Sequence, residues 1–347
     1  MSAKQVVTIV GAAAAAFVGW FQYHYNVHKR KVLDSNQSMF YNSNSFHTIT
    51  ALVPSGELKI MFDHSDSEKL KERVDRLHDA ISNAGGKRIY TGRTLTPGAV
   101  SARVPTDLIQ GVRIVLVSQW ESFDQFKNFR ASLQAGEPGS DWKVAWSTGF
   151  KRDIFSNSLY LPMWLGNMKV QNMLGIRSTY DVKTTDTIEE LMKLTKEGSK
   201  YGGAERMARS AGQGNRVMRG FTKEQKAQPV VIWNWLLAET DQTKRKSDQG
   251  YGNRMMEMLA QNGGGIMDIG IPMANLPGEK INLKWSSIAG VHYPTRDFMA
   301  DLIRSRWMVG NIQTKSLGDS LNYLTVPFSS TLDLKEPLPT LPMSAAL

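Results

Sequence analysis

The sequence of 347 residues contains no cysteine. This absence excludes a disulfide framework, thiolate metal ligands and cysteine-based catalysis. Acidic residues are the scarcer charge, with 32 Asp plus Glu against 42 Lys plus Arg and a net charge of +10. The excess of positive charge favours an anionic neighbour, such as phospholipid headgroups or an acidic protein. We expect no nucleic acid partner, because no recognised nucleic-acid module accompanies the charge.

Charged residues are also missing from positions 5–28, and Val6–Phe21 is almost wholly apolar. About twenty helical residues rise roughly 30 Å, which is the thickness of a hydrocarbon core. Residues 1–31, which close on a basic run at 28–31, therefore predict one transmembrane anchor. The basic flank predicts that the N-terminus faces out and that the bulk lies on the cytoplasmic or matrix side of a bacterial inner or organellar membrane. A cleaved secretory signal is the alternative.

Small residues recur at four-residue spacing within this predicted anchor, at Gly11, Ala15 and Gly19. Such spacing gives one face of a helix a smooth groove in which a second helix can pack closely. The pattern predicts a membrane-helix packing face for other subunits of a membrane complex. Alanine-rich anchors also produce this spacing by chance.

One pattern occurs twice in the rest of the chain. Residues 81–92 and 259–270 each combine a helix end, a glycine pair and a strand that ends in glycine. We expect an apolar strand before each copy, at Leu58–Phe62 and at Val230–Leu237, and a second strand and helix after it. Further strand material is expected at His47–Val53, before the turn at 54–56. Each copy then has the order strand, helix, strand, strand, helix, strand, which is the ferredoxin-like order.

This pattern predicts an α+β protein of two repeats that follow an N-terminal transmembrane helix. We expect the first repeat to close with a strand near Phe155–Leu161, and the last helix of the second repeat to run over Thr295–Met308. The expected organisation is a transmembrane anchor with its basic flank (1–31), a connector (32–50), a first α+β barrel repeat (51–166), a helical linker (167–228), a second repeat (229–330) and an extended tail (331–347).

A family resemblance follows from the second copy, which contains Val-Ile-Trp-Asn at 231–234, Asn-Gly-Gly at 262–264 and Tyr-Pro-Thr-Arg-Asp-Phe at 293–298. In the first copy, Trp-Glu-Ser-Phe-Asp-Gln-Phe at 120–126 takes the place of the last motif, without its proline. The pattern resembles the small domain family of unknown function numbered 1330, in the dimeric α+β barrel superfamily. The resemblance implies that the two ferredoxin-like repeats form an internal dimeric α+β barrel. Its relatives include monooxygenases, isomerases, cyclases and haem dehydratases, and the fold alone does not choose among these activities.

Polar residues at strand ends are the candidate ligand-binding residues. Asp63 and Asn234 are expected at equivalent strand positions, as are Gln119 and His292, and His64 lies beside Asp63. Such groups could bind a small hydrophobic ligand or transfer a proton in the barrel. No metal site and no cofactor is expected, although the resemblance raises haem as an alternative, with His47, His64 or His292 as its ligand. Polar strand ends that face solvent or a partner explain the same residues without chemistry.

Two functions therefore remain open at this stage. The first is a non-catalytic, membrane-anchored interaction or scaffold subunit of a larger membrane assembly, such as an accessory subunit of an energy-converting complex. Its partners would be membrane lipid and the other subunits. The second is a membrane-tethered enzyme, of the monooxygenase, isomerase, cyclase or haem dehydratase kind, that acts on a hydrophobic small molecule in the barrel. The absence of an identifiable catalytic motif favours the first.

Overall fold

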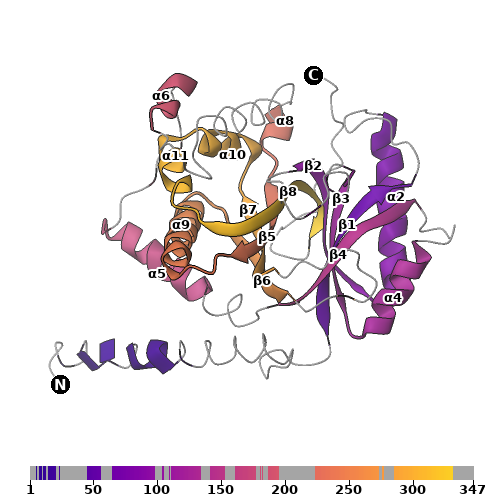
Figure 1. Cartoon of the computed structure of the whole chain (residues 1–347), viewed down its shortest axis with the longest axis horizontal. Helices are drawn as coiled ribbons and strands as arrows, with labels where there is room; N and C mark the ends of the chain where they lie inside the picture. The colour runs from indigo at the N-terminus through magenta and orange to yellow at the C-terminus, as the bar shows by residue number, and fades with distance from the viewer. Residues whose placement is uncertain are drawn as a thin grey trace.

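The structure is a computed structural model of the 347-residue chain. It describes residues 45–55, 65–97, 111–133, 141–152, 161–176, 187–194, 223–272 and 285–330, with some single positions between these ranges and among the first 23 residues. The fold is α+β, with eight antiparallel strands in one closed barrel and helices around it (Figure 1).

In the part of the first repeat that the structure describes, there are four strands and two helices. They are β1 (Phe46–Pro54), α2 (Ser65–Asn83), β2 (Lys87–Pro97), β3 (Ile114–Trp120), α4 (Phe123–Ser132) and β4 (Trp142–Arg152). The second repeat has the same order with one additional helix. Its elements are β5 (Val230–Ala238), α9 (Gln242–Gln261), β6 (Gly265–Pro272), β7 (Ser287–Tyr293), α10 (Arg296–Ile303), α11 (Arg306–Ile312) and β8 (Leu317–Ser330). The described residues between the repeats form α5 (Leu161–Met173), α6 (Ile188–Met192) and α8 (Lys223–Lys226).

The strands follow one another around the barrel in the order β1-β3-β2-β8-β5-β7-β6-β4, and β4 pairs with β1 to close it. Each repeat contributes four neighbouring strands. The two sets of strands are joined where β2 pairs with β8 and where β4 pairs with β6. Closure through these two junctions leaves no unpaired edge strand, which is the usual liability of an open sheet.

The duplicated glycine pairs make the same turn in both repeats. Gly85 and Gly263 have φ of 79° and 82°, a left-handed conformation that favours glycine because it has no Cβ. The next amide in each repeat bonds back to the helix, from Gly86 to the carbonyl of Ile81 at 2.9 Å and from Gly264 to that of Leu259 at 2.7 Å. These bonds end α2 and α9 and direct the chain into β2 and β6. The repeat predicted from residues 81–92 and 259–270 is therefore confirmed.

The motifs after β3 and β7 begin the next helix in both repeats. Ser122 caps α4 in a capping box with Gln125, and the Thr295 side chain accepts a hydrogen bond from the amide of Phe298 at 2.9 Å to cap α10. The prediction of one helix over Thr295–Met308 is wrong, because α10 ends at Ile303. Ser305 then caps a separate helix, α11.

The ends of the first repeat also differ from the prediction. Its first strand is β1, which crosses the boundary expected at residue 50, whereas the predicted strand Leu58–Phe62 lies outside the described residues. The predicted closing strand near Phe155–Leu161 is wrong at its C-terminal end, since β4 ends at Arg152 and Leu161 begins α5. The strand expected at His47–Val53 is confirmed as β1, whereas the closing strand lies earlier in the chain than expected, at Trp142–Arg152.

Helices cover the outside of both halves of the barrel (Figure 1). In the first repeat Val74, Leu77 and Ile81 recur at helical spacing on α2 and pack with Phe126 and Phe129 of α4 against the outer face of the sheet. The outer face of the second repeat packs against apolar side chains of α9 and α10. A third cluster fills the barrel interior and draws residues from both repeats. The two halves therefore share one core.

The N-terminal segment is described at positions that include Gly11, Ala15 and Gly19, all helical and exposed. A Cβ placed on Gly11 or Gly19 would meet no atom within 4 Å. Within the described parts of the chain, no helix has the length and apolar character needed to cross a membrane. The membrane anchor and its packing face remain predictions, and the connector at 32–44 and the tail at 331–347 lie outside the described residues.

Candidate functional site

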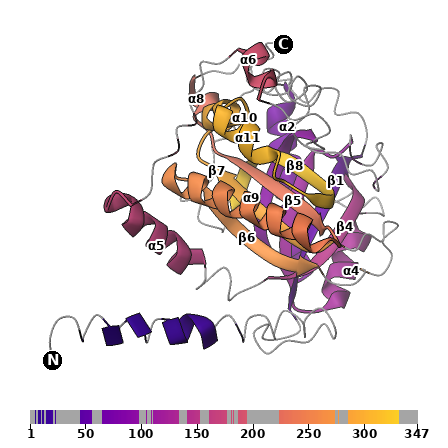
Figure 2. The same cartoon turned by 60° about the vertical axis from the view of Figure 1, so that its left-hand side comes forward.

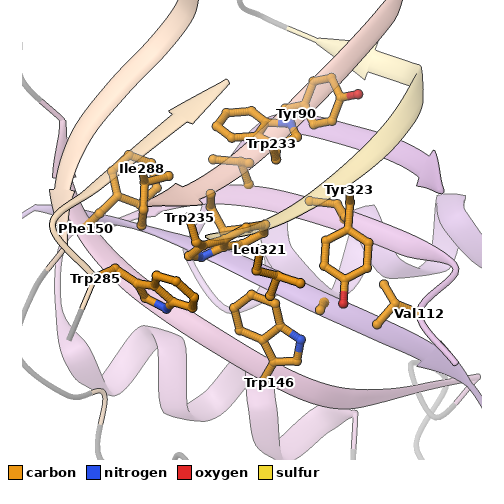
Figure 3. Close-up of a cluster of buried hydrophobic side chains, with 14 of the residues drawn as sticks. Tyr90, Val112, Trp146, Phe150, Trp233, Trp235, Trp285, Ile288, Leu321 and Tyr323 are labelled. Atoms are coloured by element: carbon orange, nitrogen blue, oxygen red, sulfur yellow. The ribbon is translucent and has the colours of Figure 1, made fainter. Parts of the chain in front are cut away.

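Aromatic rings occupy the middle of the barrel (Figure 3). They come from strands of both repeats and from the residue two before β7. The rings are those of Tyr90, Trp146, Phe150, Trp233, Trp235, Trp285 and Tyr323. Trp146 and Trp235 lie with their ring centroids 4.6 Å apart, and Tyr90 lies 5.4 Å from Trp233. These contacts join the first repeat to the second inside the barrel.

Glycines in the strands make room for these rings. A Cβ on Gly290 would lie 2.8 Å from the ring of Trp233, and a Cβ on Gly270 would collide with the ring of Phe150. Real Cβ atoms do not approach carbon so closely, because interiors are packed at van der Waals separations. The positions on β6 and β7 are therefore glycine for packing reasons, and rings fill the space next to them.

A buried polar cluster lies beside the ring of Phe150. Asp268 on β6 has a side chain that is 0 % exposed, and its Oδ1 accepts a hydrogen bond from Nε of Arg152 at 2.8 Å. The second carboxylate oxygen, Oδ2, lies 3.9 Å from Nδ1 of His47 on β1. The imidazole of His47 packs edge-on against Phe150, with ring centroids 5.3 Å apart. We call Asp268, His47, Arg152 and Gln119 the mouth cluster.

Strand pairing brings these four residues together. His47 lies opposite Phe150 in the β1–β4 pair and opposite Gln119 in the β1–β3 pair. The β4–β6 junction between the repeats places Arg152 against Gly270, two residues from Asp268. The cluster therefore exists only because the first repeat closes on the second.

The mouth cluster lies at one end of the barrel. His47 and Gln119 are each one residue from a strand end, Arg152 is the last residue of β4, and Lys87, opposite Gln119, is the first residue of β2. Exposure rises towards this end: Asp268 and His47 are buried, Gln119 is half-buried, and Lys87 is exposed. Barrel mouths are common sites for small-molecule binding.

Burial shifts both titratable groups at the centre of the cluster. Burial raises the pKa of Asp268 from 3.8 to about 6, although neighbouring Arg152 opposes the shift. Burial, together with the charge of Arg152, lowers the pKa of His47 from 6.5 to about 4, against a hydrogen bond to Gln119 that raises it. At neutral pH the carboxylate is therefore charged and the imidazole is neutral, so the two do not form an ion pair.

Two polar atoms of the cluster have no hydrogen-bond partner within the part of the chain that the structure describes: Nδ1 of His47 and Oδ2 of Asp268. Their separation of 3.9 Å is too long for a direct hydrogen bond. Leaving each such atom unpaired costs about 1–3 kcal/mol. One hydroxyl oxygen between them could accept from Nδ1–H and donate to Oδ2, which would satisfy both.

Of the site residues predicted from the sequence, Gln119 lies in the mouth cluster and His292 does not. Gln119 belongs to the mouth cluster through its hydrogen bond to His47. His292 occupies the equivalent place in the second repeat, since Gln119 pairs with Lys87 and His292 with Gly265 at the starts of β2 and β6. The equivalence of Gln119 and His292 is therefore correct. His292 faces Val231 and Gly265 in the strand register, and no residue of the mouth cluster.

The expected equivalence of Asp63 and Asn234 is wrong. Thr50 pairs with Leu116 as Asn234 pairs with Ala289, so Thr50 holds the equivalent position, and Asp63 and His64 lie outside the described residues. Asn234 also does not face the barrel interior. It alternates with the interior residues Trp233 and Trp235, and its amide donates to the carbonyls of Ile232 at 3.1 Å and Ala289 at 3.3 Å.

Sequence reasoning missed Arg152 and Asp268, and it considered His47 only as one of the histidines that could bind haem. A weak signal was present for Asp268, the only charged residue in the apolar segment Gly265–Pro272. His47 lies in a strand that alternates polar and apolar residues, so it had no distinguishing pattern. The proximity of the three residues could not be read from a sequence in which 116 positions separate Arg152 from Asp268.

Neither His78 nor His47 is placed as a haem ligand in the part of the chain that the structure describes. His78 contacts Thr91 through Nε2 at 2.9 Å and Arg88 through Nδ1 at 2.6 Å, so both ring nitrogens are engaged. The ring of His47 is enclosed by Phe150 and the polar cluster, and next to His292 the ring of Trp233 fills the interior at Gly290. Among the described residues, no group of three or more His, Asp or Glu side chains could hold a metal ion.

No protein-family model and no curated protein sequence matches the chain. The resemblance to the domain family of unknown function 1330 is therefore not confirmed. Among solved structures, a mutant chlorite dismutase from Candidatus Nitrospira defluvii is 10 % identical, with 82 % of this chain and 93 % of that chain covered and a TM-score of 0.38. An anthrone oxidase-like protein is 9 % identical, with 88 % and 98 % covered and a TM-score of 0.38. Likenesses at this level support no inference about activity.

Proposed function

We propose that the mouth cluster binds a small hydrophobic molecule through a hydroxyl group and that Asp268 transfers the proton of this group. The observation that carries the proposal is the pair of buried, unpartnered atoms, Nδ1 of His47 and Oδ2 of Asp268, 3.9 Å apart. A hydroxyl oxygen about 2.8 Å from each would complete both hydrogen bonds. The adjacent aromatic ring of Phe150 suits a hydrophobic ligand body.

The chemistry that this arrangement supports is an isomerisation by proton transfer. The hydroxyl proton of a bound enol moves to Oδ2 of Asp268, and the electron pair of the broken O–H bond forms the carbonyl. The carbon–carbon double bond shifts its electrons to the far carbon, which takes the same proton back from Asp268. The product is the ketone, the carboxylate is regenerated, and no co-reactant is consumed.

The neighbouring residues have separate roles in this step. Arg152 holds one carboxylate oxygen through its 2.8 Å hydrogen bond, which leaves the other oxygen directed at the ligand. In the tautomer that has its proton on Nδ1, His47 donates a hydrogen bond to the ligand oxygen, and Gln119 hydrogen-bonds to the same ring. A carboxyl group with a pKa of about 6 is mostly ionised at neutral pH and is a stronger base than an ordinary aspartate, so it can take the hydroxyl proton.

The binding step can be tested with two probes that differ by the hydroxyl group, 4-nitrophenol and 4-nitroanisole. Each is titrated against the full-length protein while tryptophan fluorescence is followed. We expect 4-nitrophenol to bind about tenfold or more tightly than 4-nitroanisole, because a hydrogen bond to a charged group contributes about 1.5–3 kcal/mol. Asp268→Asn should remove this preference.

The matched control is Asp248→Asn, which neutralises a partly buried carboxylate on α9 whose pKa burial also raises. This variant should keep the preference for 4-nitrophenol. Equal affinity of the wild-type protein for both probes would contradict the proposed site. The transfer step is tested by deuterium uptake at the α-carbon of an aryl ketone in heavy water, which Asp268→Asn should abolish.

The second candidate function is an interaction subunit of a membrane assembly. It is favoured by the aromatic rings that fill the middle of the barrel. Extraction in mild detergent followed by native mass measurement distinguishes the two candidates. A large complex with other chains supports the subunit, whereas a single chain or a homodimer that carries a small organic molecule supports the enzyme.

A further inference from the structure

Helix α5 and the turn after it expose an apolar surface outside the barrel. Among the side chains described between 161 and 176, only Met168 is buried, although α5 contacts α9. Met173 is 81 % exposed, and both Leu174 and Ile176 are 68 % exposed. Met163 and Val170 are exposed as well. This surface is independent of the mouth cluster and of the function proposed for it.

The composition of this helix is unusual for a surface helix. Lys169 is the only charged residue from Leu161 to Ile176. A surface helix normally has a polar face towards water, whereas a helix that is apolar all round is buried in protein or lipid. Exposed apolar patches of this kind mark contact sites for a protein or a membrane. The thirteen residues of α5 rise only about 20 Å, too short to span a bilayer.

A second apolar segment lies on the same side of the molecule. The helical positions near the N-terminus expose Ile9, Phe17, Val18 and Trp20. Figures 1 and 2 both show these N-terminal positions on the side of the barrel where α5 lies, with α4 at the opposite side. Two apolar elements more than 140 residues apart in sequence therefore lie on one side of the molecule. One continuous apolar surface could contact both α5 and the N-terminal helical positions at the same time.

We propose that α5 lies along the surface of a phospholipid bilayer, with Met173, Leu174 and Ile176 in the boundary between headgroups and acyl chains. An apolar stretch of about 10–14 residues is too short to cross a bilayer and is typical of an interfacial segment when it is not buried in a protein core. The net charge of +10 adds attraction to anionic headgroups. A membrane is favoured over a protein partner because the apolar N-terminal segment, which is predicted to enter a membrane, lies on the same side.

The absence of cysteine makes a site-specific test straightforward, since one introduced cysteine can be labelled uniquely. Met173→Cys places an environment-sensitive fluorophore on the exposed end of α5. Lys127→Cys places it on α4 as the matched control, at a side chain that is 59 % exposed. Each full-length labelled protein is mixed with vesicles of phosphatidylcholine and phosphatidylglycerol that contain a lipid with a nitroxide on its acyl chain.

We expect the nitroxide lipid to quench the label at position 173 several-fold more than the label at position 127, with a blue shift at 173 only. Equal quenching at both positions would overturn the proposal, as would no quenching at either. A blue shift at 173 without quenching by the nitroxide lipid would also overturn it, because it would show that protein covers α5.

Discussion

The stability of the variant Asp268→Asn distinguishes a functional carboxylate from a structural one. Asp268 is fully buried, and its pKa rises from 3.8 to about 6 on folding. A raised carboxyl pKa means that the folded protein resists ionisation more than the unfolded chain does. Ionised Asp268 therefore destabilises the fold above pH 6, and this cost is absent below the unfolded pKa of 3.8, where both states are protonated.

The magnitude follows from the shift of roughly two pKa units, at about 1.4 kcal/mol for each unit. Asn has nearly the same shape and no charge, so Asp268→Asn should raise the free energy of unfolding at pH 7 by up to about 3 kcal/mol. The gain should shrink between pH 6 and pH 4 and vanish below it. Urea unfolding of both proteins across this pH range measures the difference.

A control variant should show the opposite sign. Asp141 is partly exposed and accepts a hydrogen bond from Nε of Arg76 at 2.8 Å, so Asp141→Asn removes an ordinary ion pair and should cost up to about 1 kcal/mol. If Asp268→Asn is destabilising at pH 7 in the same way, Asp268 holds the fold together through Arg152. A structural role would then be enough to explain why Asp268 is buried at this position, and the proposed function would lose its basis.

Two further outcomes are expected. Gly290→Ala should destabilise the protein by about 1–3 kcal/mol because its Cβ would lie 2.8 Å from the ring of Trp233, whereas Gly252→Ala on α9, where a Cβ meets nothing within 4 Å, should stabilise it by about 0.4–1 kcal/mol. Thermal unfolding of both variants measures the two changes in stability. Equal changes would refute the close packing inferred between Gly290 and the ring of Trp233. The lowered pKa of His47 means that stability present above pH 6.5 is lost as the pH falls towards 4, by up to about 3 kcal/mol. His47→Gln should therefore unfold at lower pH than the wild type in an acid titration followed by circular dichroism, and an unchanged acid midpoint would show that His47 is not buried as a neutral ring.

The repeat was predictable because it is written in local signals. Glycine pairs that end α2 and α9 need left-handed backbone, and the caps Ser122 and Thr295 follow strands in both copies. Each signal acts within a few residues, so it is visible in the sequence. The errors fall on the closing strand of the first repeat, which ends at Arg152, and on the last helix of the second repeat, which is divided into α10 and α11.

The candidate site was only partly predictable, for a different reason. Gln119 was found because a polar strand end is a local feature. Its partner His47 lies across the β1–β3 ladder, and Asp268 meets Arg152 across the junction between the repeats. Asn234 was placed on the wrong face because the sequence alone does not give the strand register, and a shift of one residue exchanges the two faces.

The amino-acid sequence alone determined the order of helices and strands, the duplication, the excess of positive charge and the absence of thiol chemistry, since these depend on composition and on neighbouring residues. The tertiary structure decided which strands meet. Closure of β4 on β6 and of β2 on β8 fills the barrel with rings from both repeats. The same closure buries Asp268 against Arg152 and His47, and shifts their pKa values, because only a closed barrel removes these groups from water.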